Sequence, residues 1–216
     1  MVAQVAQPVL VSLNGEQGRQ MDVFRKMMRF TSFITFPLMF GFGLVAKEFI
    51  VIAIGEKWLA SAELIQILCV SGATMPLATL FSNMIISKGR SGTFFWCTFS
   101  LGLVQIITML LIWQWGIRSM VIAYMLINTS WLLVWLFFVR RLTGYGYWRF
   151  FCDVMPFALA AAGVMAASYA ATLSLSNLWA LLISRFVIAA TLYYIVMKVA
   201  RVKILKECER FVFKRK

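Results

Sequence analysis

Six long apolar runs constrain this chain more than any other feature of its sequence. Stretches of 17 to 24 residues are free of charge, apart from one arginine in the last; they cover residues 30–46, 64–87, 93–114, 119–139, 154–173 and 177–197. The hydrocarbon core of a bilayer is about 30 Å thick, and an α-helix needs roughly 20 apolar residues to cross it. The pattern predicts an all-α polytopic membrane protein with a six-transmembrane-helix lobe.

The composition excludes a wholly soluble enzyme. The chain has 216 residues, of which 62% are hydrophobic and 13% charged, whereas soluble domains are about 45–50% apolar and about 25% charged. There is no histidine, and the four cysteines show no C-x-x-C spacing, so neither a metal nor another cofactor is expected. Because the six runs also hold no carboxylate, a membrane glycosyl- or acyltransferase is disfavoured, and the chain is not expected to be an enzyme.

The basic residues indicate an orientation. With residues before the first run placed in the cytoplasm, 17 of the 20 lysines and arginines outside the runs fall on the cytoplasmic side, and Lys47, Lys57 and Arg118 fall outside. Cytoplasmic loops of membrane proteins are enriched in Lys and Arg. We therefore expect a multi-pass membrane protein with both ends of the six-helix set in the cytoplasm. Trp58 and Tyr145 are expected at headgroup depth on opposite sides.

The segments that flank the six runs have different expected roles. Residues 1–29 are predicted to be the end of a truncated helix followed by a cytoplasmic loop, and residues 30–197 the six-helix lobe. Residues 198–216 are basic and amphipathic, which predicts a tail on the anionic inner leaflet. A nucleic-acid partner is not expected, because no aromatic residues alternate with the basic ones and no soluble binding domain is present.

The first third of the chain carries a family resemblance. Its most specific elements are the helix end at residues 8–12 within PVLVSLNGEQGRQ, the FPL of residues 36–38, and the turn of Gly55, Lys57 and Trp58. These elements resemble the C-terminal half of Wzx-like polysaccharide flippases, in the multidrug/oligosaccharidyl-lipid/polysaccharide exporter superfamily. The resemblance implies 12 to 14 helices in two lobes that alternate a central cavity between the membrane faces.

The same resemblance implies a substrate and a partner. The protein would lie in the bacterial inner (plasma) membrane, and the substrate would be polyprenyl-diphosphate-linked oligosaccharide, moved outward for polysaccharide or lipopolysaccharide biosynthesis. The second lobe would be supplied by the missing N-terminal half or by a second copy. The alternative is a non-transporting membrane fragment or assembly partner.

Three uncharged polar residues within the runs are candidates for substrate binding. Asn83 lies on a face of small and polar residues, for which helix packing is favoured over cavity lining. Gln105 follows a similar pattern in the next run. Asn128 lies at helical spacing from aromatic residues, a combination of groups that suits sugar rings. For the neighbouring Trp131 and Trp135, a lipid-facing position is favoured over a role in sugar binding.

Arg185 is the charged candidate for substrate binding. A charge at the centre of a membrane helix costs roughly 2.5–3.5 kcal/mol on insertion scales, so the side chain should face the bundle, a cavity or the interface. It is expected either to extend toward the outer headgroups, or to contact the substrate diphosphate or an acidic group of the absent lobe.

Two further patterns concern the shape and packing of the helices. Pro37 and Gly41 predict either a hinge or a static kink in the first run. Alanines recur every fourth residue in the fifth run, at positions 158, 162, 166 and 170, and predict a tightly packed seam.

Overall fold

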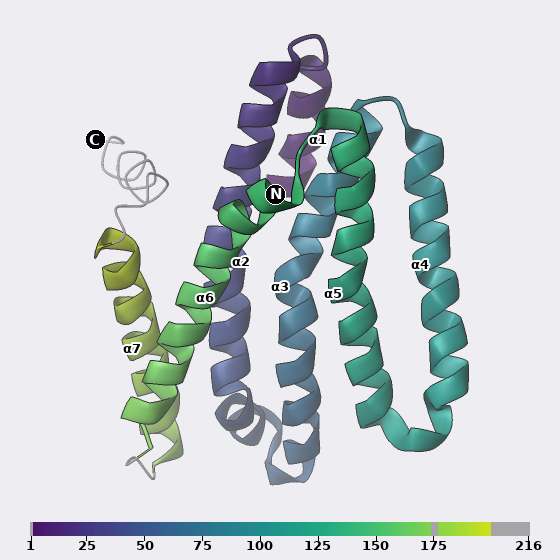
Figure 1. The fold of residues 1–216 in the computed structure, drawn as a ribbon. Coiled ribbons are helices and arrows are strands. Elements are labelled where there is room, and N and C mark those ends of the chain that lie inside the picture. The colour runs from purple at the N-terminus through teal and green to yellow at the C-terminus, as the bar shows by residue number, and fades with distance from the viewer. Residues whose placement is uncertain (1, 174–176, 200–216) are drawn as a thin grey trace.

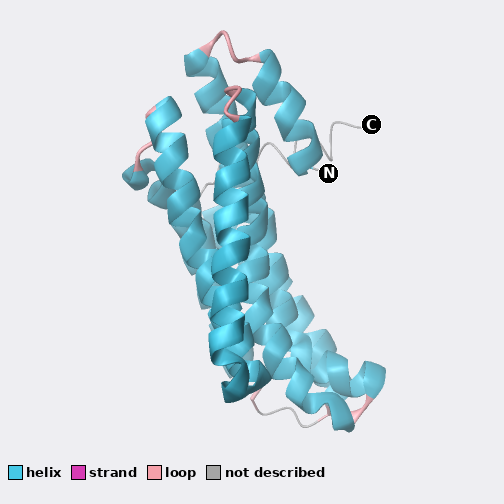
Figure 2. Cartoon of the chain, turned by 90° about the vertical axis from the view of Figure 1, so that its right-hand side faces the viewer, coloured by secondary structure: helices cyan, strands magenta, loops and turns pink. Residues whose placement is uncertain are grey.

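The fold is an elongated bundle of helices. The computed structural model describes residues 2–173 and 177–199, and this part of the chain contains no strand. Its α-helices are α1 (Val2–Ser12), α2 (Gln17–Ile54), α3 (Leu59–Ser87), α4 (Ser91–Ile112), α5 (Gly116–Thr143), α6 (Tyr147–Ala171) and α7 (Leu178–Val199). Figures 1 and 2 show the long helices running along one common axis. The predicted all-α polytopic fold is confirmed.

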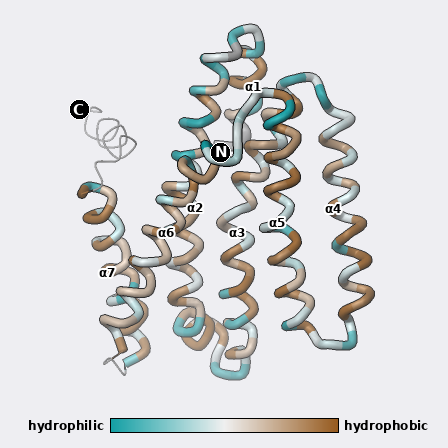
Figure 3. The backbone as a smooth tube through the Cα atoms, in the orientation of Figure 1, coloured by the Kyte–Doolittle hydropathy of each residue, from teal (hydrophilic) through white to brown (hydrophobic). Residues whose placement is uncertain are grey.

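The apolar helices correspond to the predicted spans. Five described stretches are long and apolar enough to cross a membrane, and one of them, Ser91–Thr143, contains both α4 and α5. These two helices turn back on each other through the short helix η2 (Trp113–Trp115) and lie antiparallel in Figure 1. Each of the six predicted runs therefore coincides with its own helix, α2 to α7. Figure 3 shows hydrophobic segments along the helices and hydrophilic segments at the turns.

The second helix begins earlier than the sequence predicts. Residues 17–29 were expected in a loop, but they form the first turns of α2. Gln20, Phe24 and Met28 recur every fourth residue and are fully or almost fully buried, so one face of this segment packs against the protein while the other stays polar. The Gln20 side-chain amide donates to the carbonyl oxygen of Leu10 at 2.7 Å. Packing of this buried face stabilises the helix over residues 17–29. The buried face is not evident from the polar composition of the segment.

The bundle is organised around α2 and α3. On one side α3 packs against α1, α2 and α5, and α4 lies beyond α5; on the other side α6 and α7 pack against α2 and against each other. Close approach of α2 and α3 depends on glycine: a Cβ at Gly72 would come within 3.1 Å of the Met39 sulfur. Gln66 of α3 adds a polar contact between the two helices, because its amide donates to the Gly43 carbonyl at 3.0 Å.

Helix α2 continues through Pro37. Proline has no N–H, so the carbonyl of the residue four positions earlier, Phe33, lacks its usual donor within the helix. The Tyr193 hydroxyl of α7 donates to that carbonyl at 2.9 Å. The backbone group released by Pro37 is therefore satisfied by protein, as the hydrocarbon environment requires.

The chain connections lie at two ends of the bundle. The α1–α2, α3–α4 and α5–α6 connections are at one end, here called the basic end (Figure 1). The α2–α3 and α4–α5 connections, the end of α6 and the start of α7 are at the other. Lys88, Arg140 and Arg149 lie at the basic end, whereas Lys57 and Arg118 lie at the opposite end. The basic tail, residues 200–216, lies outside the described residues.

Tyr145 is fully buried against the protein near the basic end, and its ring meets that of Phe24 edge to face with centroids 5.6 Å apart. Its expected headgroup depth stays a prediction. One packing expectation is wrong for the described chain. Ala162, Ala166 and Ala170 were expected in a packed seam, but they are exposed. The buried face of α6 is formed instead by a different set of residues, which includes Asp153, Phe157, Ala161, Val164 and Ser168.

Candidate functional site

A buried ion pair joins α2 to α7. Arg185 Nη1 lies 2.6 Å from Glu48 Oε1, and both side chains are about nine-tenths buried. Arg185 also donates from Nε to Thr172 Oγ1 at 3.1 Å and from Nη1 to the Leu44 carbonyl at 3.3 Å. Its guanidinium lies 5.1 Å from the ring centroid of Tyr169. Arg185 thus faces the bundle, as the cost of a charge in hydrocarbon predicts.

The partner of Arg185 was missed in the sequence. An acidic partner was expected from an absent lobe, but Glu48 of the same chain is the partner of Arg185. The six runs hold no carboxylate, as stated, because Glu48 and Asp153 lie just outside the runs 30–46 and 154–173, although they lie within the helices α2 and α6. Glu48 lies two residues beyond the charge-free run 30–46, so a search for uninterrupted apolar residues ends before it. Within the described chain, Glu48 Oε2 is a buried oxygen without a hydrogen-bond partner.

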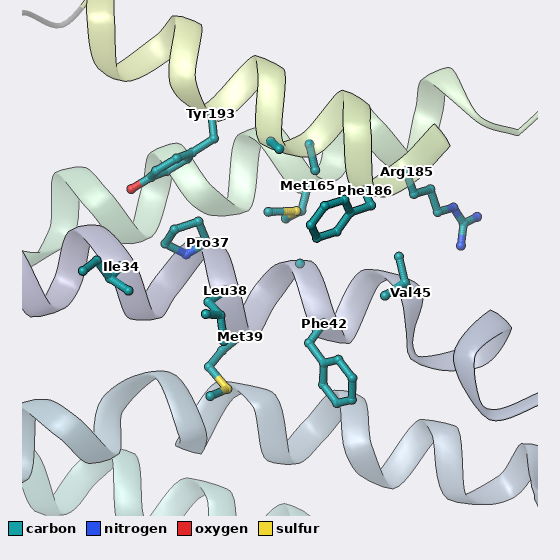
Figure 4. Close-up of a pocket in the computed structure, with 13 residues that line it drawn as sticks. Ile34, Pro37, Leu38, Met39, Phe42, Val45, Met165, Arg185, Phe186 and Tyr193 are labelled. Carbon is teal, nitrogen blue, oxygen red and sulfur yellow. The ribbon is translucent and has the colours of Figure 1, made fainter. Parts of the chain in front are cut away.

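An apolar cavity of about 550 Å³ adjoins this ion pair. Figure 4 shows Arg185 near one end of the cavity and Tyr193 near the other, with Pro37, Phe42 and Phe186 among the residues between them. The polar groups of Arg185 and Tyr193 bond to Glu48, Thr172 and the backbone of α2. The cavity surface is therefore suited to apolar groups.

Asn128 lies in a different part of the bundle. It lines a pocket of about 30 Å³ between α3, α4 and α5, together with Tyr124, Trp131 and Trp135. This volume is close to that of one water molecule. The Asn128 amide donates to the Tyr124 carbonyl at 2.8 Å, and the buried indole nitrogen of Trp131 has no hydrogen-bond partner within the described chain.

The four candidate binding residues do not form one site. Arg185 lies between α2, α6 and α7, whereas Gln105 is half-buried on α4, one turn beyond Leu101 of the Asn128 pocket. Asn83 is buried in α3, one turn before Ser87, which bonds to Gln20 near the basic end. Substrate contact by these four residues stays a prediction, and the structure distributes them over three regions.

A second buried charge cluster lies near the basic end, here called the Asp153 cluster: Asp153, Arg25, Arg29 and Tyr145. Asp153 on α6 is fully buried. It accepts hydrogen bonds from Arg25 Nε at 2.9 Å and Nη2 at 3.1 Å, and from Arg29 Nε at 2.6 Å. The Tyr145 hydroxyl donates to the same carboxylate at 3.0 Å.

The electrostatics of the Asp153 cluster keep Tyr145 as a proton donor. Burial, with a further contribution from the Asp153 charge, raises the pKa of Tyr145 above its usual value. This cluster is not evident from the sequence, because Asp153 directly precedes the run 154–173 and lies 124 and 128 positions from its two arginines. One signal in the sequence could have indicated the Asp153 cluster. It is a single acidic residue at the border of an apolar run, together with arginines at the same membrane border.

Comparisons with known proteins support the family resemblance. Residues 1–63 match a family described as "Polysaccharide biosynthesis protein". The chain is 29% identical over 90 residues to an "Uncharacterized membrane protein in cps region" of Klebsiella pneumoniae, covering 42% of this chain and 19% of that protein. No solved structure matches the chain significantly.

Two further relatives have names that refer to polysaccharide biosynthesis. The teichuronic acid biosynthesis protein TuaB of Bacillus subtilis is 29% identical over 97 residues, covering 44% of this chain and 20% of TuaB. The lipopolysaccharide biosynthesis protein WzxC of Escherichia coli is 23% identical over 90 residues, covering 42% of this chain and 18% of WzxC. Each match thus spans about a fifth of the relative. The predicted resemblance to Wzx-like polysaccharide flippases is confirmed.

Proposed function

We propose that this chain forms one lobe of a transporter that moves polyprenyl-diphosphate-linked oligosaccharide from the cytoplasmic to the periplasmic leaflet by alternating access. The observation that carries the proposal is the similarity of residues 1–63 to polysaccharide biosynthesis proteins, among relatives that include TuaB and WzxC. In the structure this segment comprises α1, α2 and the start of α3. It therefore includes the helix that holds α6 and α7 through both buried charge clusters.

The exposed surface of α6 supports the involvement of a second lobe. Ala162, Gly163 and Ala166 form a small-residue surface that is not covered by the described chain. Small residues allow membrane helices to approach closely, and rocking transport requires two helical units around a shared site. The second unit is proposed to be an N-terminal lobe or a second copy of this chain.

Complementation tests the transport proposal. In a strain that lacks its own flippase, this chain alone is expected not to restore surface polysaccharide, because a single lobe encloses no alternating cavity. Co-expression with the N-terminal lobe of a related transporter is expected to restore it. Surface polysaccharide would be measured by gel staining, and membrane insertion of the chain would be confirmed in both strains.

The controls separate the possible results. Restoration by the chain alone, with crosslinking that shows only monomers, would contradict the two-lobe proposal. Failure with every N-terminal lobe supplied, despite normal insertion and lobe association, would favour the non-transporting alternative.

The proposed orientation places the basic end in the cytoplasm. A cysteine introduced at Glu56, at the opposite end, is expected to react with a membrane-impermeant maleimide in intact spheroplasts, whereas native Cys208 is expected to react only after permeabilisation. The reason is the bias of Lys and Arg toward cytoplasmic segments. Labelling of Cys208, and not of position 56, in intact spheroplasts would reverse the orientation.

A further inference from the structure

Charge is unbalanced in the Asp153 cluster. Two arginines converge on one carboxylate, so the cluster retains one positive charge in excess. We infer that Arg25 and Arg29 form a binding site for the phosphate group of an anionic membrane phospholipid. This inference concerns a lipid of the surrounding bilayer and does not depend on the transport proposal.

Asp153 fixes the two guanidinium groups. The carboxylate is fully buried and engages Nε and Nη2 of Arg25 together with Nε of Arg29. The Tyr145 hydroxyl donates to it at 3.0 Å and restricts its orientation further. Each guanidinium has five N–H donors in a rigid plane. The arginine side chains are thus held in place before a ligand arrives, so they lose less conformational entropy when a second anion binds.

Both arginines remain accessible from outside the bundle. Their side chains are 29% and 42% exposed for Arg25 and Arg29, whereas Asp153 is not exposed. The exposed portion of a planar guanidinium suits the oxygens of a phosphate group, to which it donates charge-assisted hydrogen bonds. Part of each arginine side chain is therefore accessible to a ligand, whereas the carboxylate that holds both is not.

The position along α2 is that of a lipid headgroup. Phe30 directly follows Arg29 and begins the charge-free run. From Arg29 to Glu48 the helix rises over 19 residues, about 28 Å at 1.5 Å per residue, which is close to the thickness of the hydrocarbon core. Arg29 thus lies at one border of that core, the depth at which phosphate groups of phospholipids are found.

Neighbouring charges favour an anion. Arg149 lies one helical turn before Asp153 on α6, and Arg140 lies at the end of α5 with its guanidinium 5.1 Å from the Tyr147 ring centroid. Asp22 on α2 is acidic and acts on Arg25, so it opposes an anion, but the arginines at this end outnumber it. Basic pockets between membrane helices attract anionic headgroups.

Lipid binding by the purified full chain tests the inference. In nanodiscs of phosphatidylcholine, increasing amounts of phosphatidylglycerol would be added, and retained lipid measured by native mass spectrometry. Arg29→Gln is expected to weaken retention of phosphatidylglycerol about tenfold, since the change removes one arginine near the headgroup. Arg29→Lys should give an intermediate loss, because it keeps the charge and removes the planar donor set.

Arg19→Gln is the matched control. Arg19 lies on the same helix and at the same end, but it is exposed and pairs with Glu16 at 3.4 Å. Circular dichroism would show whether both variants are folded. Equal retention of phosphatidylglycerol by folded Arg19 and Arg29 variants would overturn the site. Equal retention of phosphatidylcholine and phosphatidylglycerol by the unaltered chain would also overturn it.

A competitor distinguishes the two sources of lipid phosphate. Polyprenyl diphosphate would be added to the nanodiscs at the same molar ratio as phosphatidylglycerol. Retention of phosphatidylglycerol within twofold supports a phospholipid site. Its replacement by polyprenyl diphosphate would overturn the assignment and place the transported lipid there.

Discussion

Arg185→Gln is expected to destabilise the folded chain by about 3 kcal/mol, because it leaves Glu48 as a buried charge without its partner. The pair is 2.6 Å apart, and both side chains are about nine-tenths buried. Glu48→Gln should cost a similar amount for the converse reason. The double variant Glu48→Gln/Arg185→Gln removes both charges, and its loss is expected to be at least about 2 kcal/mol smaller than the sum of the single losses. Unfolding in mixed micelles would provide these free energies.

Arg118→Gln is the control for this cycle. Arg118 and Glu63 are 3.8 Å apart and both are exposed, so the substitution is expected to change stability by less than about 0.5 kcal/mol. Additive losses at Glu48 and Arg185 would show that the two charges are not coupled. In that case the alternative, in which the arginine extends toward the headgroups, would be the better description.

Asp153→Ala is expected to have the second large effect, a loss of about 3 kcal/mol. The change removes the shared acceptor of Arg25, Arg29 and Tyr145. Loss of a buried partner typically costs about 3–5 kcal/mol, and the lower figure applies because the arginines are partly exposed to solvent. The free energies of unfolding of Asp153→Ala and of the unaltered chain would be compared in the same mixed micelles.

A second substitution at position 153 separates charge from hydrogen bonding. Asp153→Asn retains an oxygen that can accept from Tyr145, so its loss should be smaller than that of Asp153→Ala. Asp22→Asn serves as the control, because Asp22 is exposed and lies at the same end of the bundle. If Asp153→Ala is no more destabilising than Asp22→Asn, the cluster does not stabilise the fold.

The apolar runs were sufficient to predict the helices because burial in lipid imposes a simple length requirement. The inward orientation of Arg185 was predictable for the same reason, since a charge is costly in hydrocarbon. Its partner was not predictable, because pairing of α7 with α2 joins residues 137 positions apart. Single-sequence patterns carry no information about such contacts.

The start of α2 shows a different limit. Residues 17–29 are strongly polar, and hydropathy alone therefore predicts a loop. Phe24 and Met28 nevertheless supply a buried stripe against the core. The candidate binding residues show the same limit, because Asn83, Gln105, Asn128 and Arg185 were selected by polarity within each run, and polarity does not reveal which helices become neighbours.

The polar contacts that α2 makes to α6 and α7 at three places along its length have a mechanical consequence. Near the basic end, Arg25 and Arg29 bond to Asp153 of α6. One turn further along α2, the Phe33 carbonyl accepts from Tyr193 of α7. Near the opposite end, Glu48 pairs with Arg185 of α7. Sliding or tilting of α2 relative to these two helices would break polar contacts at both membrane borders at once. Helices α2, α6 and α7 therefore form a rigid unit. Bending of α2 at Pro37 would strain its polar contacts to both α6 and α7. Helix α4 lies outside this group and is held mainly by α5, so relative movement within the lobe is expected there first.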